Sequence, residues 1–144
     1  MIYKAGVEDL PIVAELACKL WPDNAVEDLC SEFLPLLSKP DAAIFLAYDG
    51  ETAIGFAQCQ LRYDYVEGTE SSPVGYLEGI FVAENHRKQG IAKELLSCCE
   101  HWARSKGCSE FASDCELDNV KSLQFHLSVG FEEANRVICF TKKL

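Results

Sequence analysis

The sequence predicts an α/β (α+β) protein with helices and strands intermixed around one mixed sheet. Three features favour this class. Apolar residues recur at helical spacing over 8–20 and 91–106, strand-like apolar and aromatic runs lie between them, and 74–115 follows a strand–helix–strand pattern. No internal repeat, low-complexity tract or Pro/Gly-rich linker divides the 144 residues, so we expect a single domain over 1–144.

The first half of the chain predicts a strand, two helices and a hairpin. Residues 2–5 suit a short first strand, and the spacing of Leu10, Val13 and Leu16 predicts a helix over 8–20, which Pro22 ends. A second helix is expected over about 24–37. The strand-like segments 43–48 and 53–62 flank Asp49-Gly50, a pair typical of hairpin turns.

The second half predicts a central strand, two helices and two further strands. The largely apolar segment 74–82 suits a buried strand, and the helix over 91–106 ends before Gly107. A strand at 110–115, a helix at 119–129 and a last strand at about 133–141 complete the order. The last strand is apolar enough to pair with a neighbouring molecule, to exchange into it, or to finish its own sheet.

The composition excludes several classes of function. A net charge of −10 repels nucleic acid and anionic membranes, and it favours a cationic partner. The sequence has no apolar run long enough to span a bilayer, and Glu8 and Asp9 stand where a secretory signal needs apolar residues. We therefore expect a soluble, cytoplasmic protein that binds neither nucleic acid nor membrane.

The eight cysteines are numerous for this length, but their spacing does not suit a disulfide framework. They form no CxxC pair, and most lie among apolar residues, as structural thiols do. Cys98 and His101 are three residues apart, but no second half with zinc-like spacing follows. We expect reduced cysteines and no metal.

The segment between the central strand and the 91–106 helix has the features of a phosphate-binding turn. Basic residues precede Gly90, and the helix starts directly after it. A helix N-terminus offers unpaired N–H groups and a positive dipole end, and a glycine lets the backbone approach an anion. An ordinary basic turn is the alternative. Neither a Walker string nor a dinucleotide-binding G-x-G-x-x-G string is present.

This turn, residues 87–92, resembles the R/Q-x-x-G-x-G/A signature of the GNAT superfamily of N-acetyltransferases, whose backbone amides bind the pyrophosphate of acetyl-CoA. Residues 119–131 resemble the superfamily's N-x-x-A-x-x-x-Y-x-x-x-G-F helix, with Ser122 at the small position and His126 in place of tyrosine. Further blocks across nearly the whole chain are similar to the aminoglycoside 6′-N-acetyltransferases: Leu20-Trp21-Pro22, Arg62-Tyr63-Asp64-Tyr65-Val66, Ser71-Ser72-Pro73, Leu77-Glu78-Gly79-Ile80-Phe81-Val82, Ala112-Ser113-Asp114 and Gly130-Phe131-Glu132-Glu133.

The resemblance implies both a fold and a function. The fold would be a GNAT-like mixed, mostly antiparallel sheet of about six to seven strands flanked by about four helices. The function would be acetyl-CoA-dependent acetylation of the 6′-amine of aminoglycosides, by direct attack of the amine on the thioester, in a homodimer that confers antibiotic resistance. The alternatives are acetylation of a polyamine or of a peptide or protein amine, and a non-catalytic acyl-CoA-binding domain that keeps the fold.

The resemblance also assigns the residues that bind the cofactor. Pantetheine would run along the central strand like an added strand, and the turn would hold the pyrophosphate, with Asn119 contributing from the second motif. The strand residues are Ile80, Phe81 and Val82, and the turn residues are Arg87, Lys88, Gln89, Gly90, Ile91, Ala92 and Lys93.

Glu78 is the one acidic residue inside the apolar central strand, where an unpaired buried carboxylate would be costly. A salt bridge or a bulge would explain it structurally. The functional explanation, which the resemblance supports, is a carboxylate that binds the acceptor and takes the ammonium proton through water. Asp114 is either a second anchor for ammonium groups or a loop or helix-capping residue.

Four further residues take roles from their positions in the resemblance. Trp21 and Tyr65 are acceptor contacts, with core packing as the alternative for both aromatics. Asn135 stands at a substrate-binding position where some relatives carry an acid. His126 is a cofactor-side residue and a candidate proton donor to the departing thiolate.

Overall fold

The computed structural model describes all 144 residues. The helices and strands confirm the predicted order up to residue 128, and two short 3-10 turns, η1 (Val7–Asp9) and η2 (Glu84–His86), accompany them. The elements are β1 (Ile2–Lys4), α1 (Leu10–Leu20), α2 (Val26–Ser38), β2 (Ala42–Asp49), β3 (Thr52–Arg62), β4 (Val74–Val82), α3 (Ile91–Ser105), β5 (Phe111–Ser113) and α4 (Val120–Ser128).

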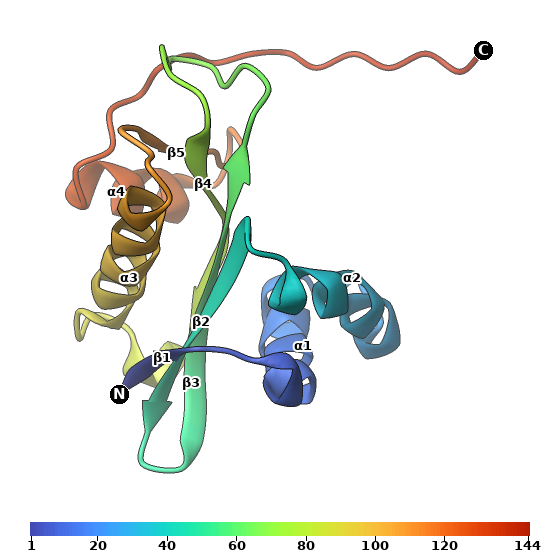
Figure 1. Ribbon diagram of the computed structural model, residues 1–144, viewed down its shortest axis with the longest axis vertical. Coiled ribbons are helices and arrows are strands. Elements are labelled where there is room, and N and C mark those ends of the chain that lie inside the picture. Colours follow the sequence, from blue (N-terminus) through green and yellow to red (C-terminus); the bar gives the residue numbers. More distant parts are fainter.

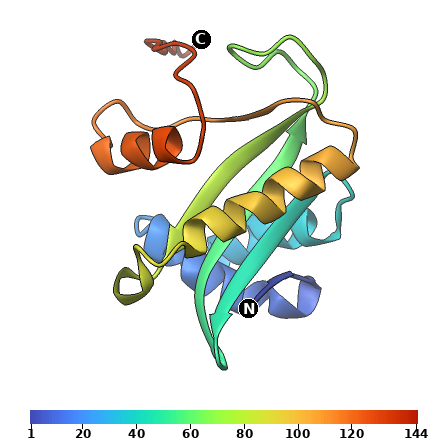
Figure 2. The ribbon, with the colours of Figure 1, turned by 90° about the vertical axis from the view of Figure 1, so that its left-hand side faces the viewer.

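The five strands form one mixed sheet in sequential order, β1-β2-β3-β4-β5. The first three pairings are antiparallel, and β4 pairs with β5 in parallel through the α3 crossover. Helices α1 and α2 cover one face of the sheet, and α3 and α4 lie on the other side (Figures 1 and 2). The predicted α/β class with a mostly antiparallel sheet is therefore confirmed.

Alternation along the strands sends apolar side chains to both faces. On β2, Ile44 and Leu46 pack in the core beneath α1 and α2, whereas Ala43 and Ala47 pack in the core beneath α3. A strand places successive side chains on opposite faces, so one run of apolar residues serves two cores. The strands can therefore be apolar throughout, as the sequence showed.

The predicted last strand at 133–141 is wrong for a single copy of the chain. Residues 132–144, the C-terminal arm, form no helix or strand and run away from the sheet (Figure 1). The sheet accordingly has five strands instead of six or seven. The apolar residues Val137, Ile138 and Phe140 are 68%, 81% and 87% exposed, because no neighbouring strand of the chain pairs with the arm.

Strand β4 carries the features that position the site. It pairs with β5 only over Gly75, Tyr76 and Leu77, because β5 is just three residues long, shorter than the predicted 110–115. The rest of β4, from Glu78 to Val82, keeps β3 on one side and has no strand on the other. A β-strand edge of this kind has backbone groups free to bind a ligand.

All eight cysteines are free thiols, and no cluster of three or more His, Cys, Asp or Glu side chains gathers as a metal site would require. None of the helices combines the length and apolar composition needed to cross a lipid bilayer.

Candidate active site

The turn between β4 and α3 presents a row of free backbone donors. Gly90 is the N-cap of α3 in the left-handed conformation, with φ of 84°, and no side chain caps the helix. The backbone N–H groups from Lys88 through Lys93 donate no hydrogen bond within the protein. Unpaired donors at a helix N-terminus, together with the positive end of the helix dipole, bind phosphate groups. The turn is therefore built for an anion.

The backbone of this turn is also strained at a second residue. Lys88 has φ of 62°, in the left-handed region that side chains other than glycine seldom adopt. Such a conformation costs about 1–2 kcal/mol, and strain of this size is often found at ligand-binding sites. The strained residue lies two positions before Gly90, inside the row of free donors.

Arg87 is held against β4 at the start of the same turn. Its Nε donates to the carbonyl oxygen of Val82 at 2.8 Å, and its guanidinium lies 5.9 Å from the centre of the Phe81 ring. Gln89 makes a long contact of 3.5 Å with the carbonyl oxygen of Asn85. One hydrogen bond thus fixes Arg87 and leaves its terminal nitrogens for a ligand, beside the unpaired edge of β4.

The second predicted motif forms α4 and the turn before it. Asn119 is the N-cap of α4, and its side-chain oxygen accepts from the backbone N–H of Ser122 at 3.1 Å. Its amide nitrogen makes no hydrogen bond within the protein and can donate to a ligand. Asn119 therefore has a structural contact in addition to the cofactor contact predicted for it.

His126 lies on α4 and contacts the end of β5. Its Nδ1 is 2.6 Å from the carbonyl oxygen of Ser122, which can only accept, so Nδ1 carries a hydrogen. Its Nε2 is 2.8 Å from the Ser113 hydroxyl, and that hydroxyl also lies 3.2 Å from the Leu77 carbonyl oxygen on β4. The ring thus reaches the point where β4 and β5 separate.

On the α1/α2 side, Glu78 is engaged in an ion pair with Arg62 from β3. Arg62 donates to both carboxylate oxygens, at 3.0 and 2.8 Å, and the Glu78 side chain is 19% exposed. Both structural explanations left open for Glu78 are therefore met, because it has Arg62 as a salt-bridge partner and is the extra residue of a β-bulge in β4. A bidentate pair also fixes the orientation of a carboxylate, which a functional role would require.

The ion pair extends into a network that includes the other predicted acid. The Arg62 guanidinium lies 3.4 Å from the centre of the Tyr76 ring, and the Tyr76 hydroxyl donates to Asp114. Arg62 and Tyr76 thus connect Glu78 to Asp114. The structure brings both predicted carboxylates into one network, which we call the acceptor network: Arg62, Tyr76, Glu78 and Asp114.

Two pKa values are shifted within the acceptor network. The hydrogen bonds to Glu78 raise the pKa of the Arg62 guanidinium above its ordinary value, so this residue stays charged. Burial, and then the hydrogen bond to Asp114, raise the pKa of the Tyr76 phenol above its ordinary value. Tyr76 therefore remains a hydrogen-bond donor throughout the neutral pH range.

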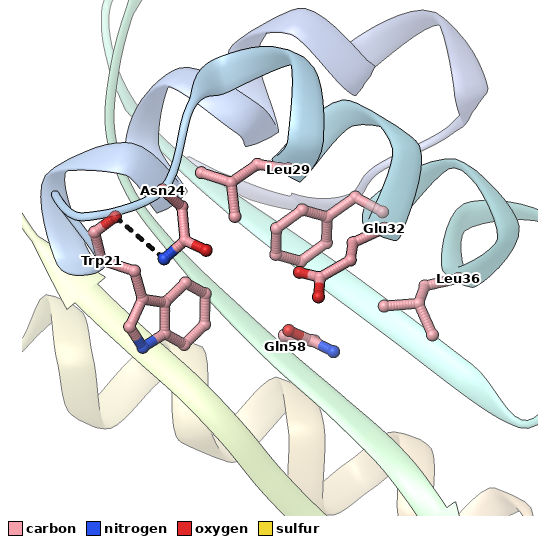
Figure 3. Close-up of a pocket in the computed structure, with 7 residues that line it drawn as sticks. Trp21, Asn24, Leu29, Glu32, Leu36 and Gln58 are labelled. Atoms are coloured by element: carbon pink, nitrogen blue, oxygen red, sulfur yellow. Dashed lines mark hydrogen bonds between the residues drawn. The ribbon is translucent and has the colours of Figure 1, made fainter.

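The remaining predicted acceptor residues lie in two places. Trp21 ends α1 and packs against Phe33 and Phe56, while it also lines a cavity between α2 and the sheet (Figure 3). Tyr65 is 76% exposed on the β3–β4 loop. Asn135 lies in the C-terminal arm and donates to Glu67 of that loop at 3.0 Å. Trp21 thus packs in the core and borders a cavity, whereas Tyr65 has its side chain free.

Three residues of the site were not identified from the sequence: Arg62 as the partner of Glu78, Tyr76, and Ser113. Arg62 and Ser113 lie within the blocks that resemble the family, which was the available signal. Their roles depend on strand register, because the adjacent residues Gln58 and Cys59 of β3 pair with Gly79 and Leu77, which makes Glu78 the extra residue of a β-bulge in β4.

Comparison with known proteins agrees with these features. Residues 10–131 match the acetyltransferase (GNAT) family. An aminoglycoside N(6′)-acetyltransferase type 1 of Acinetobacter haemolyticus is 45% identical, covering 90% of this chain and 89% of the relative. Another of that name, from Serratia marcescens, is 41% identical over 100% and 99% of the two chains. The solved structure of AAC(6′)-Iy with the bisubstrate analogue CoA-S-monomethyl-acetylneamine has a TM-score of 0.96 and 38% identity, covering 100% of this chain and 98% of that one.

Proposed function

This chain belongs to the acetyltransferase (GNAT) family, and from that membership we propose that it transfers an acetyl group from acetyl-CoA to the 6′-amine of aminoglycosides. The observation that carries the proposal is the position of two sites on one strand. Glu78 and Tyr76 of the acceptor network lie on β4, and the anion-binding turn follows the end of the same strand. Modification of such a drug at this amine is a route to antibiotic resistance.

We assign the donor side to backbone groups. The free N–H groups from Lys88 through Lys93 suit the pyrophosphate, and the unpaired edge of β4 suits the peptide-like amides of pantetheine. Arg87 contributes positive charge from its fixed position on Val82, and Asn119 can donate from the other side. The whole donor site is assembled from the end of one strand and the starts of two helices.

On the acceptor side, we assign Glu78 to bind the substrate ammonium and to take its proton, through water. An amine must be neutral to attack a carbonyl carbon, so a nearby base accelerates the reaction. After Glu78 has taken one proton, the new N–C bond forms and the thioester C–S bond breaks, and a second proton passes from the attacking nitrogen to the departing sulfur, which leaves as the thiol. Asp114 provides a second negative charge, and Arg62 is a positioning residue that orients Glu78.

His126 has a supporting role on the donor side in this proposal. In the neutral ring Nδ1 holds the hydrogen, and the single Ser113 hydrogen is donated to the Leu77 carbonyl oxygen, so no ring proton faces the β4–β5 opening. Only the imidazolium form can donate from Nε2. We therefore assign His126 to position Ser113, and to act as an acid only when it is charged.

We further propose a homodimer of single-domain subunits, 1–144, in the cytoplasm, where acetyl-CoA is available. The C-terminal arm supports the dimer, because its extended, apolar residues have no partner within the chain while β1 and β5 both leave a sheet edge free. Sedimentation should show a dimer for the full chain and a monomer after truncation at Arg136. A monomeric full chain would contradict this part of the proposal.

Thiol release from acetyl-CoA tests the function directly. We expect release with aminoglycosides that carry a 6′-amine, and a product acetylated at that nitrogen by mass spectrometry and NMR. An aminoglycoside with a 6′-hydroxyl is the matched control and should give no release. Good turnover of spermidine or of a peptide amine, with none of the aminoglycosides, would overturn the proposal in favour of those acceptors. Tight acetyl-CoA binding without transfer to any amine would indicate a non-catalytic domain.

A further inference from the structure

The cavity beside Trp21 is polar in places where a packed core would not be. It measures about 430 Å³ and lies between α2 and β3 (Figure 3). Its lining residues are Trp21, Asn24, Leu29, Glu32, Phe33, Leu36 and Gln58. Apolar walls that carry a few polar groups are typical of small-molecule sites. Of these seven residues, only Trp21 was expected to bind a substrate.

Gln58 is the clearest sign that the cavity is a binding site. It is 7% exposed, and it is the one buried polar or charged residue of the chain. Its side-chain amide makes no hydrogen bond to the protein, although both of its ends are able to do so. Its amide atoms are nevertheless accessible from the cavity, because the one fully buried side-chain polar atom without a partner is Nε1 of Trp102. A ligand in the cavity can therefore hydrogen-bond both ends of the Gln58 amide.

Two more polar groups line the cavity opposite Gln58. Glu32 of α2 forms no ion pair within the chain, and its carboxylate points into the same space as Gln58 (Figure 3). Asn24 donates from its amide nitrogen to the carbonyl oxygen of Trp21 at 3.4 Å, which leaves its side-chain oxygen available. The cavity thus offers the negative charge of Glu32, a hydrogen-bond acceptor on Asn24, and the Gln58 amide, which can both donate and accept. These groups lie between aromatic walls. These groups suit an aminated, hydroxylated ring.

The cavity adjoins the acceptor network through Trp21 and Gly79. In the β3–β4 ladder, Gln58 is opposite Gly79, the residue after Glu78. The Trp21 ring covers Gly79 so closely that a Cβ there would lie 2.6 Å from it. One molecule can therefore place an amine at Glu78 and a second ring beyond Trp21.

We propose that this cavity is a second acceptor subsite, in which Glu32 and Gln58 bind an amine-bearing ring other than the one that is acetylated. The inference rests on the proposed function and specifies its substrate class. Acceptors with several aminated rings would occupy both places, whereas a single amino sugar would occupy only the place beside Glu78. Glu32 and Gln58 thereby determine specificity without contact with the reacting atoms.

The test compares two acceptors on two variants. Glu32→Gln should raise the KM of a multi-ring aminoglycoside about fivefold, the size expected when one charge-assisted contact at a partly exposed site is lost. The kcat/KM of a single 6-amino sugar should not change. Glu27→Gln, on the same helix but outside the cavity, is the matched control and should affect neither acceptor.

Gln58→Leu keeps the size of the side chain and removes its amide. It should raise the multi-ring KM in the same way while the melting temperature stays close to that of the wild type, because the removed amide makes no hydrogen bond within the protein. Equal effects on both acceptors, or no effect of Glu32→Gln, would overturn the subsite while aminoglycoside acetylation by the wild type stands. A wild type that acetylates no aminoglycoside would overturn the proposed function and the subsite together.

Discussion

Strand β4 carries the two sites that we propose, and they differ in the chemical groups that form them. Beyond its C-terminal end, the turn at 88–93 offers backbone N–H groups, whereas along its length the acceptor network consists of side chains from two strands, β3 and β4, and the loop after β5. A backbone site depends on a glycine and a helix start, which are local features of the sequence. A side-chain network depends on how strands align. Substitutions should therefore affect the two sites through different physical mechanisms.

The largest effect should come from Glu78→Gln, which removes one negative charge of the acceptor network and keeps the shape of the side chain. We expect turnover of an aminoglycoside to fall about a thousandfold, within the range for loss of a general base. The KM for acetyl-CoA should not change, because the turn makes no contact with Glu78. Steady-state thiol release measures both. Glu51→Gln, in the exposed β2–β3 hairpin, is the control. Unchanged turnover would remove Glu78 as the base.

A negative charge introduced at Gly90 by substitution tests the donor site. A Cβ at this position meets no atom within 4 Å, and Asp and Asn both tolerate a positive φ. Gly90→Asp places a negative charge among the free N–H groups and should raise the KM for acetyl-CoA about a hundredfold, by repulsion of the pyrophosphate. Gly90→Asn has the same shape without the charge and should raise the KM for acetyl-CoA only about threefold. Equal behaviour of the two variants would mean that the turn binds no anion.

Arg62→Ala should have an intermediate effect, because it frees Glu78 without removing it. We expect kcat to fall about tenfold, the cost of losing two charged hydrogen bonds at a partly exposed position. Arg62→Lys should recover part of the loss, since an ammonium supplies the charge and lacks the two-pronged geometry. The KM for acetyl-CoA is the internal control. Faster turnover by Arg62→Ala would instead mean that Arg62 competes with the substrate for Glu78.

The smallest effect is expected at the far end of the acceptor network. Tyr76→Phe removes the hydroxyl that donates to Asp114 and keeps the ring beneath Arg62. The free energy of unfolding in urea should fall by about 1 kcal/mol, as for one hydrogen bond, and turnover should change less than about threefold. A loss of turnover as large as that of Arg62→Ala would show that the network acts as one unit.

The sequence predicted the donor site more completely than the acceptor site. Gly90, the helix start and the basic residues are consecutive, so their arrangement follows from local geometry. Glu78 and Asp114 were identified, but the connection between them was not. Arg62 and Glu78 are sixteen residues apart on neighbouring strands, and the bulge at Glu78 sets which side chains meet. Local patterns do not specify such a bulge.

The fold was predictable wherever an element buries its apolar residues against the rest of the chain. The helix at 91–105 is amphipathic, and its apolar side packs in the core as expected. The C-terminal arm has the apolar content of a strand, but hydrophobicity alone does not supply a pairing partner. The cavity beside Trp21 could not be predicted from the sequence either. Whether the Gln58 amide is free depends on how β3 and α2 pack together.

Calorimetric titration of Glu78→Gln and Gly90→Asp with both CoA and an aminoglycoside tests most directly whether the two sites are separate. Glu78→Gln should bind CoA as tightly as the wild type and the aminoglycoside more weakly, and Gly90→Asp should show the reverse. If either variant weakened both ligands to the same extent, the division of β4 into a backbone-built donor site and a side-chain-built acceptor site would be contradicted.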